Sequence, residues 1–451
     1  MELNLIKKNT MAFIMKYSIP AIVAMVLTSM VTVVDGFFIS SYIGEEALAS
    51  MNLGIPILYI FLAVGIMIGV GGVSIAGRRL GQQMIEKSIN VFNQTVMTGT
   101  IIFAVLALIA TLVIRPIVDF TGLDNHVVEI MLSYYRIMIW VYPFLVLNIV
   151  YGMFLRGEGK HSLFMFNTII TTFLNILLDY ILIVRFNMGL QGAAFASGVA
   201  VLTGTFIMTG YFLSKKTLFS FKKFTFEKSD LKETLYNGSS ELIGQLSLSI
   251  TMFFMNYVIL KRLGLIGVAS MSIIGYSRYI IEMIIIGFGQ GISPMISYSY
   301  GAGAFDVGEK LRKQTSKLVL GLGVVSCLAL LIGGQVYGSI FTDDPMHLEM
   351  ITFGLKLFSL SFLFMGYNII SSFYFTGNGY AKESIIISSL RGLIILSINI
   401  FLLPVVFGNT GIWLIAVATE GITFLVTLKL VNQAKKKMVV NQNSKYKELV
   451  N

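Results

Sequence analysis

Uninterrupted apolar runs separated by short polar stretches dominate this chain. Each run is close to or longer than the roughly 20 residues that a helix needs to cross a bilayer. Strands of a transmembrane barrel would instead be about ten residues long and would alternate between apolar and polar positions. The pattern therefore predicts an all-α membrane protein of twelve transmembrane helices. We place them near residues 11–40, 51–77, 93–115, 130–154, 163–186, 190–213, 236–260, 264–297, 315–341, 350–375, 384–407 and 410–431.

The composition supports a membrane protein, because only 12% of the 451 residues are charged and the mean hydropathy is +0.81. A soluble chain is about 25% charged, since its surface must face water. The three histidines, His126, His161 and His347, lie in predicted loops at no metal-ligand spacing. We therefore expect neither enzyme activity nor a cofactor.

The basic residues predict the orientation. Most of the 33 Lys and Arg residues lie in loops on the side of both termini, and the opposite loops hold Arg115, Arg185, Lys261 and Arg262. By the positive-inside rule, both termini are expected in the cytoplasm, on a multi-pass protein of the inner (cytoplasmic) cell membrane. The net charge of +10 then reflects topology, so we expect no nucleic-acid partner.

The chain is also internally duplicated. A shift of 220 residues aligns Ala49-Ser50-Met51 with Ala269-Ser270-Met271, and it aligns glycines 69, 71 and 81 with glycines 289, 291 and 301. Parallel repeats of this kind are typical of transporters, with the substrate site near the bilayer midplane. We predict an N-terminal lobe with helices 1–6 (1–214), a basic cytoplasmic linker (215–235), a C-terminal lobe with helices 7–12 (236–432) and a cytoplasmic tail (433–451).

Two aspartates are predicted at similar depth in the first lobe. Asp35 is 19 residues past Lys16, roughly 28 Å along its helix, and Asp179 is six residues before Arg185, roughly 9 Å from the outer side. Asn175 lies one turn from Asp179 on the same face. Pro20 interrupts the backbone hydrogen bonds of the first helix, and we count it among the candidate ion-coupling residues.

This group can bind a proton, because burial favours the neutral form of a carboxyl group. It can also bind Na⁺ through its oxygens. The alternative is a structural aspartate at a helix interface, but a buried acid without a basic partner is a costly way to hold helices together. We therefore favour ion coupling at Asp35, Asn175 and Asp179, with Na⁺ as the possible metal.

The second lobe holds a different set of charges. Arg278 and Glu282 are four residues apart on one helix and can form a structural pair. Arg391, with Glu420 or Glu241, could form an ion pair that locks the lobe or a polar floor for cationic substrates. The candidates for a second-lobe substrate site are Glu241, Glu282, Arg391 and Glu420.

Seven short stretches carry a family resemblance: SIP at 18–20, VDGFFI at 34–39, GEEALA at 44–49, RGEG at 156–159, NILLD at 175–179, GQGISP at 289–294 and GNTGIW at 408–413. In these the chain resembles the MATE (multidrug and toxic compound extrusion) transporters, over nearly its whole length. The resemblance implies a V-shaped pair of six-helix bundles and exchange of drugs for cations. It assigns ion coupling to Asp35, Asn175 and Asp179, with Tyr134 and Thr203 nearby. Glu241 resembles a helix 7 acid of other branches.

We therefore expect a secondary multidrug efflux transporter, a monomer that moves cationic or amphipathic molecules across the bilayer by antiport against H⁺ or Na⁺. Its methionines and aromatic residues suit promiscuous binding of flat cations. The alternative is a lipid-linked oligosaccharide flippase of the same superfamily. Such a flippase would line its cleft with several basic residues for a pyrophosphate, and of the basic residues here we expect only Arg278 and Arg391 inside the membrane.

Overall fold

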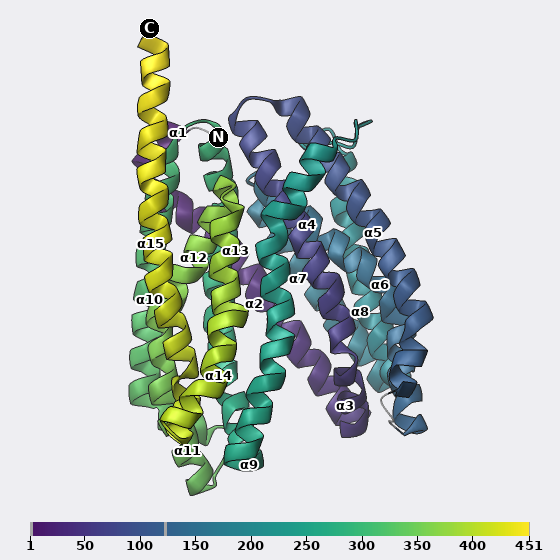
Figure 1. Cartoon of the computed structure of the whole chain (residues 1–451). Coiled ribbons are helices and arrows are strands. Elements are labelled where there is room, and N and C mark those ends of the chain that lie inside the picture. The colour runs from purple at the N-terminus through teal and green to yellow at the C-terminus, as the bar shows by residue number, and fades with distance from the viewer. Residues whose placement is uncertain (1–2, 121–123, 451) are drawn as a thin grey trace. The chain divides into compact units, whose positions relative to one another are not determined.

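The computed structural model describes residues 3–120 and 124–450, and the regular structure in these ranges is helical (Figure 1). The first part of the chain contains α1 (Leu3–Lys8), α2 (Thr10–Tyr42), α3 (Glu45–Leu53), α4 (Ile55–Gly81), α5 (Ile85–Phe120), α6 (Asn125–Gly157), α7 (His161–Asp179), the π-helical turn η1 (Tyr180–Arg185) and α8 (Gly189–Leu213). The second part contains α9 (Lys228–Gly301), α10 (Phe305–Ser339), α11 (Pro345–Phe358), the 3₁₀ turn η2 (Ser359–Ser361), α12 (Phe362–Asn378), α13 (Ala381–Ser389), the π-helical turn η3 (Leu390–Ile394), α14 (Ile395–Val406) and α15 (Asn409–Val450).

The twelve predicted spans are all helical. Eleven continuous helices in the described ranges are long and apolar enough to cross a membrane. The longest, α9, contains two of the predicted spans. They are separated by a kink at Gly264, where the backbone leaves the helical region with φ 69° and ψ −164°. The protein is therefore an all-α, multi-pass membrane protein, as predicted.

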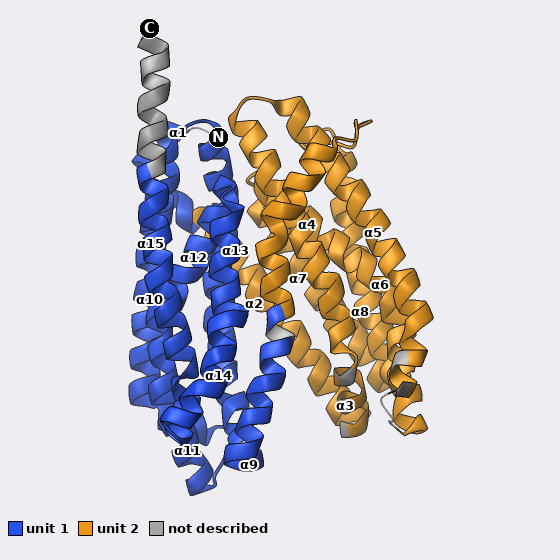
Figure 2. Cartoon of the chain, in the orientation of Figure 1, with its two compact units in different colours: residues 1–15, 247–451 blue, residues 16–246 orange. Residues whose placement is uncertain are grey.

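The helices form two compact units (Figure 2). We call residues 16–246 the N-terminal unit, and residues 1–15 with 247–451 the C-terminal unit. These boundaries differ from those predicted at 214 and 236. The first 15 residues group with the C-terminal unit, and the start of α9 groups with the N-terminal unit.

Close contacts with α4 explain where the start of α9 belongs. A Cβ on Gly71 would lie 2.0 Å from the backbone oxygen of Thr234, so the two helices touch at backbone distance. Arg79 also forms an ion pair with Asp230 at 3.3 Å. Helix α9 begins at Lys228, eight residues before the predicted start of its first span.

The predicted linker is bound along the side of α5. Three amide side chains, those of Asn90, Asn93 and Gln94, each donate to a backbone carbonyl and accept from a backbone N–H in residues 220–227, at 2.9–3.2 Å. These pairs satisfy backbone groups in a segment that has no regular structure of its own. The segment is therefore a fixed part of the N-terminal unit.

The internal duplication extends to backbone conformation. Three pairs of turn residues with positive φ are separated by 220 positions, the same shift that aligns the sequence. They are Gly44 and Gly264, Gln83 and Gly303, and Gly159 and Gly379, the last pair with φ 80° at both sites. Because few residues adopt positive φ, this coincidence shows that the two halves share the same turns.

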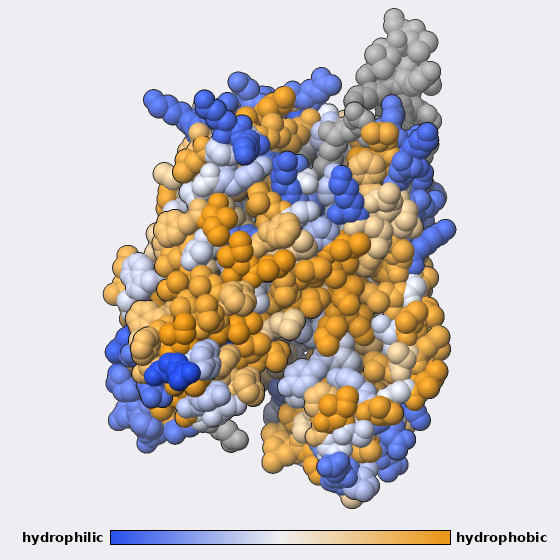
Figure 3. Space-filling model, turned by 180° about the vertical axis from the view of Figure 1, so that it is seen from behind, coloured by the Kyte–Doolittle hydropathy of each residue, from blue (hydrophilic) through white to orange (hydrophobic). Residues whose placement is uncertain are grey.

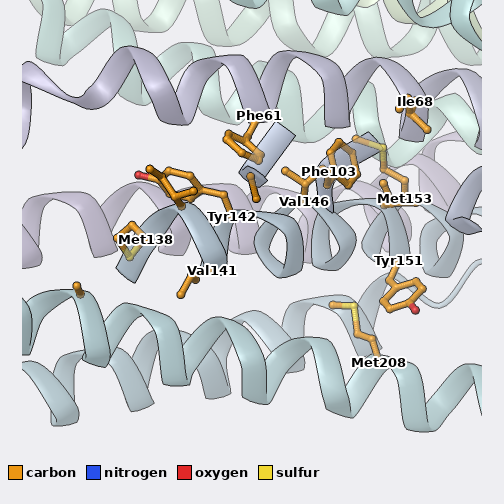
Figure 4. Close-up of a cluster of buried hydrophobic side chains, with 14 of the residues drawn as sticks. Phe61, Ile68, Phe103, Met138, Val141, Tyr142, Val146, Tyr151, Met153 and Met208 are labelled. Carbon is orange, nitrogen blue, oxygen red and sulfur yellow. The ribbon is translucent and has the colours of Figure 1, made fainter. Parts of the chain in front are cut away.

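The core of the N-terminal unit lies between α4, α6 and α8. Phe61, Tyr142, Val146 and Met208 are among its fully buried side chains (Figure 4). Helices α4 and α6 approach closely where Gly65 faces Val146, since a Cβ there would come within 1.9 Å of the valine side chain. Small residues that allow such contact are typical of helix pairs in membranes.

Apolar side chains cover much of the surface of each unit. Figure 3 shows a broad hydrophobic band across each unit, with hydrophilic residues toward its ends. Leu112, Phe206, Ile332 and Val405 are between 65% and 84% exposed. Such surfaces are stable only against lipid tails, which agrees with the membrane assignment.

Candidate functional site

Three helices of the N-terminal unit bring the predicted acidic group together. Asp35 lies on α2, Tyr134 on α6, and both Asn175 and Asp179 on α7. Asp179 is fully buried and Asn175 is 2% exposed, whereas Asp35 is half-buried. Asn175 and Asp179 share a face because they are four residues apart on a helix.

Ser197 on α8 connects this group and was not predicted. Its hydroxyl accepts from the Asn175 amide at 3.2 Å and donates toward the Asp35 carboxylate at 3.5 Å. The Asp35 carboxyl also lies close enough to Asp179 and Asn175 to interact with them electrostatically. The buried Tyr134 hydroxyl is close enough to both aspartates to interact with them electrostatically.

The group has more acceptors than donors. One oxygen of Asp35, both of Asp179 and the amide oxygen of Asn175 are buried without a donor among the described residues. Two ionised carboxylates that lie close together repel one another, so a proton on one of them or a cation between them would stabilise the group. The geometry therefore suits the uptake and release of a small cation.

A π-helical turn follows directly after Asp179. Helix α7 ends at this residue, and in the next turn the Phe186 N–H donates to the carbonyl of Ile181 at 3.0 Å, an i to i+5 bond. Turns of this kind are rare and often occur at functional sites. The backbone is thus irregular at the end of the helix that carries two members of the group.

Two predicted members lie elsewhere. The Thr203 hydroxyl donates to the Val199 carbonyl of its own helix at 2.7 Å, and no described contact joins it to the acidic group. Thr203 lies six residues beyond Ser197 on α8, roughly 9 Å further along the helix axis. Pro20 lies on α2, 15 residues before Asp35, or roughly 22 Å.

Four charged residues of the C-terminal unit form one connected network. Arg391 donates to Glu420 at 2.7 Å and to Glu282 at 2.6 Å. Glu282 also pairs with Arg278 at 3.3 Å, and the Asn368 amide donates to Glu420 at 2.8 Å. Two acids and two bases thus neutralise one another, and Arg391 sits on the π-helical turn η3.

A small cavity of about 10 Å³ adjoins this network and is lined by Arg278, Arg391 and Glu420. It has room for about one water molecule. Glu241, the remaining second-lobe candidate, belongs instead to the N-terminal unit. The start of α9 packs against α4 there, since a Cβ on Gly238 would lie 1.9 Å from the Met67 carbonyl oxygen.

Comparison with known proteins identifies the family. The MatE family model matches residues 20–181 and 242–403, which is most of the chain. The chain belongs to the MatE family. Its members are membrane transporters, so this MatE protein is a transporter and not an enzyme. The two matched stretches begin 222 residues apart, close to the 220-residue repeat.

Relatives of this MatE protein match over almost their whole length. The Multidrug export protein MepA of Staphylococcus saprophyticus is 24% identical over 439 residues, covering 97% of this chain and 96% of its own. The MepA protein of Staphylococcus aureus is 23% identical over 434 residues, covering 95% and 94%.

Solved structures show the same fold. A MATE in complex with MaL6 has a TM-score of 0.90 at 22% identity, and an outward-facing multidrug resistance MATE transporter of the MOP superfamily has a TM-score of 0.89 at 22% identity. Each comparison covers 94% of this chain and 96% of the other. The two-bundle MATE architecture is therefore shown, as predicted.

Proposed function

We propose that this protein is a secondary active efflux transporter, which exports organic cations and other amphipathic drugs by antiport against H⁺ or Na⁺. The observation that carries the proposal is the proximity of Asp35 to Asp179, in a group with four buried oxygens that lack donors among the described residues. The multidrug export relatives support a drug substrate.

Coupling follows from the electrostatics of this group. With a proton or Na⁺ bound, the two carboxyls are compatible with their close contact. Without it, they repel one another in a medium of low dielectric constant, where such repulsion is strong. Ion binding and release therefore favour different arrangements of α2 and α7. A transporter that alternates between two states can use this difference to drive export.

The C-terminal unit favours a cationic substrate over the pyrophosphate of a lipid-linked oligosaccharide. Arg278 and Arg391, the arginines that we expected inside the membrane, are both in contact with glutamates. The guanidinium of Arg391 is engaged by two carboxylates and has little capacity left for a phosphate. This arrangement supports drug export over the flippase alternative.

We further propose that the transporter works as a monomer in the cell membrane, by alternating access, with both termini in the cytoplasm. Clusters of basic residues at one end of the N-terminal unit support this orientation, because Arg78, Arg79, Arg156 and the 215–235 segment would all face the cytoplasm.

Gradient-driven transport in proteoliposomes tests the proposal. Uptake of ethidium into vesicles would be measured with an imposed pH gradient and no Na⁺, and separately with a Na⁺ gradient at equal pH. We expect one of the two gradients to drive concentrative uptake, which also identifies the ion. Transport that proceeds equally without either gradient, and never against the dye gradient, would contradict antiport.

A further inference from the structure

Arg156 is a buried cation that has no acidic partner among the described residues. It lies in the last turn of α6 and is 3% exposed. Its guanidinium stacks on the Phe164 ring, 4.4 Å from the ring centre. The Nη1 atom is buried and has no hydrogen-bond partner among the described residues. The interaction with a ring face compensates only part of the free energy that a guanidinium loses when it is removed from water. The site therefore favours an additional anion.

The second repeat shows that the fold does not require this charge. The shift of 220 residues places Thr376 at the position of Arg156 and Ser384 at that of Phe164. Both are fully buried, and their hydroxyl oxygens lie 2.8 Å apart. The turn of the second repeat has the same positive φ, at Gly379, as the first has at Gly159, and it contains a neutral hydroxyl pair in place of the arginine and the ring. Arg156 is an addition specific to the first repeat.

The acid of the same turn is engaged elsewhere. Glu158 accepts from the Tyr211 hydroxyl at 2.8 Å, from the Thr217 hydroxyl, and from the Phe219 N–H at 2.8 Å. It attaches the α6–α7 turn to the segment after α8. These three hydrogen bonds all come from neutral donors, and Glu158 does not form an ion pair with Arg156.

Other basic and aromatic groups gather on this turn. Lys160 is exposed at the start of α7. The Tyr17 ring packs against the His161 ring at an angle of 48°, with the ring centres 4.7 Å apart, and the exposed Lys16 lies over the Tyr17 ring at 5.7 Å. Tyr17 adjoins the turn itself, since a Cβ on Gly159 would lie 3.6 Å from its hydroxyl. Basic and aromatic side chains at one end of a transmembrane bundle are the usual means of holding a lipid headgroup.

We propose that the α6–α7 turn binds a phosphate group, with Arg156 as the buried anchor and Lys160 at the entrance. The forked donors of a guanidinium match phosphate oxygens, and their hydrogen bonds to an anion are strong. An anionic phospholipid is the favoured source, because the turn lies at the end of a membrane-spanning helix. Free inorganic phosphate has the same chemistry, so the experiment separates the two sources.

Thermal unfolding in lipid nanodiscs provides the test. The wild-type protein would be compared in neutral phosphatidylcholine, in the same lipid with phosphatidylglycerol, and in neutral lipid with inorganic phosphate. The test variant is Arg156→Thr with Phe164→Ser, the pair used by the second repeat, and Arg156→Gln is a second variant. The control is Lys223→Gln, which removes an exposed charge of the 215–235 segment.

We expect phosphatidylglycerol to raise the unfolding temperature of the wild type and of Lys223→Gln by several degrees, and both Arg156 variants to lose this gain. Stabilisation by inorganic phosphate alone would support the site and assign it to a free anion. Equal stabilisation of wild type and Arg156 variants would overturn the proposal.

A second measurement needs no variant. A phosphatidylglycerol analogue with a photoreactive headgroup should label the wild-type protein in peptides that contain residues 156–164. Labelling confined to other basic segments, such as that around Lys223, would overturn the proposal even if the Arg156 variants failed to fold.

Discussion

Ser197 is the residue that joins the two sides of the acidic group, because its hydroxyl both accepts from Asn175 and donates toward Asp35. A serine can do this without adding charge, so it helps to order the carboxyl of Asp35 while leaving the ion chemistry to the acids. Thr203, on the same helix, carries the same functional group in a different role, since its hydroxyl donates to the backbone of its own helix and makes no other hydrogen bond among the described residues.

This contrast gives a matched pair of variants. Ser197→Ala removes the donor to Asp35, and a hydrogen bond to a charged group contributes about 1.5–3 kcal/mol. We expect it to slow ion-driven export by about tenfold or more at equal protein level. Thr203→Ala should leave the rate within about twofold of the wild type. Dye efflux from cells that express equal amounts of each variant would measure both, and a slow Thr203→Ala with a normal Ser197→Ala would contradict the assignment.

Depth along the helices explains which site residues the sequence could predict. Asp35 and Asp179 stand out because charges are rare in apolar spans, and counting residues from the basic loop ends places them at one level. Ser197 gives no such signal, since serine is common in membrane helices. The same residue counting could have found it: it lies eight residues past Gly189, a depth close to that of Asp179, whereas Thr203 lies deeper.

At the scale of helices, Arg391 is the centre of the C-terminal network. It joins α9 through Glu282 and α15 through Glu420, and Asn368 on α12 completes the set. The sequence suggested either Glu420 or Glu241 as its partner. The structure gives Glu420 and Glu282, and Glu241 lies in the part of α9 that belongs to the N-terminal unit.

The network predicts that substitutions of its members lower the free energy of unfolding by unequal amounts. Arg391→Met leaves two buried carboxylates without their shared partner, and breaking a buried pair costs about 3–5 kcal/mol. Glu420→Gln should cost less, because Arg391 keeps Glu282. The double variant should be more stable than the sum of the single losses predicts. Thermal unfolding in detergent measures all three, and strictly additive losses would show that the contacts contribute little.

Element boundaries were harder to predict than the elements. Apolar runs identify membrane spans well, but α9 starts in the polar stretch 228–235, where hydropathy gives no signal. Its helical form there depends on contacts with α4 and α5, such as the ion pair between Arg79 and Asp230. For the same reason the 215–235 segment reads as a loose linker in sequence, although three α5 amides bind its residues 220–227.

Across the whole molecule, two copies of one fold carry different chemistry. The 220-residue shift places Met255 opposite Asp35 and Asn399 opposite Asp179, so the acidic group has no counterpart in the second repeat. Conversely, Ala200 stands opposite Glu420. The repeats therefore share their turns. The acidic group of Asp35 and Asp179, for which the structure describes no basic partner, belongs to the first repeat. Coupling is thus expected to depend on the N-terminal unit.

The presence of one acidic group predicts how export depends on the membrane potential. Since Asp35 and Asp179 are in close contact, we expect one to keep its proton through the cycle, giving one ion per cycle. Exchange of one H⁺ for one monovalent cation moves no net charge across the membrane. Each uncompensated charge that crossed would change the free energy of transport by about 2.3 kcal/mol per 100 mV. Export of a monovalent dye should therefore respond to a pH step and ignore a potassium–valinomycin potential. A voltage response at zero pH gradient, without Na⁺, would show a different stoichiometry.

The most direct test of the coupling site compares uphill and downhill transport by one variant. Asp35→Asn in proteoliposomes should still exchange labelled for unlabelled dye, because the fold and the substrate path remain. It should fail to accumulate dye against a gradient under any ion gradient, and Asp179→Asn should fail in the same way. Asp119→Asn, an exposed acid of the same unit, should behave as the wild type. Concentrative transport by Asp35→Asn at the wild-type rate would contradict the account.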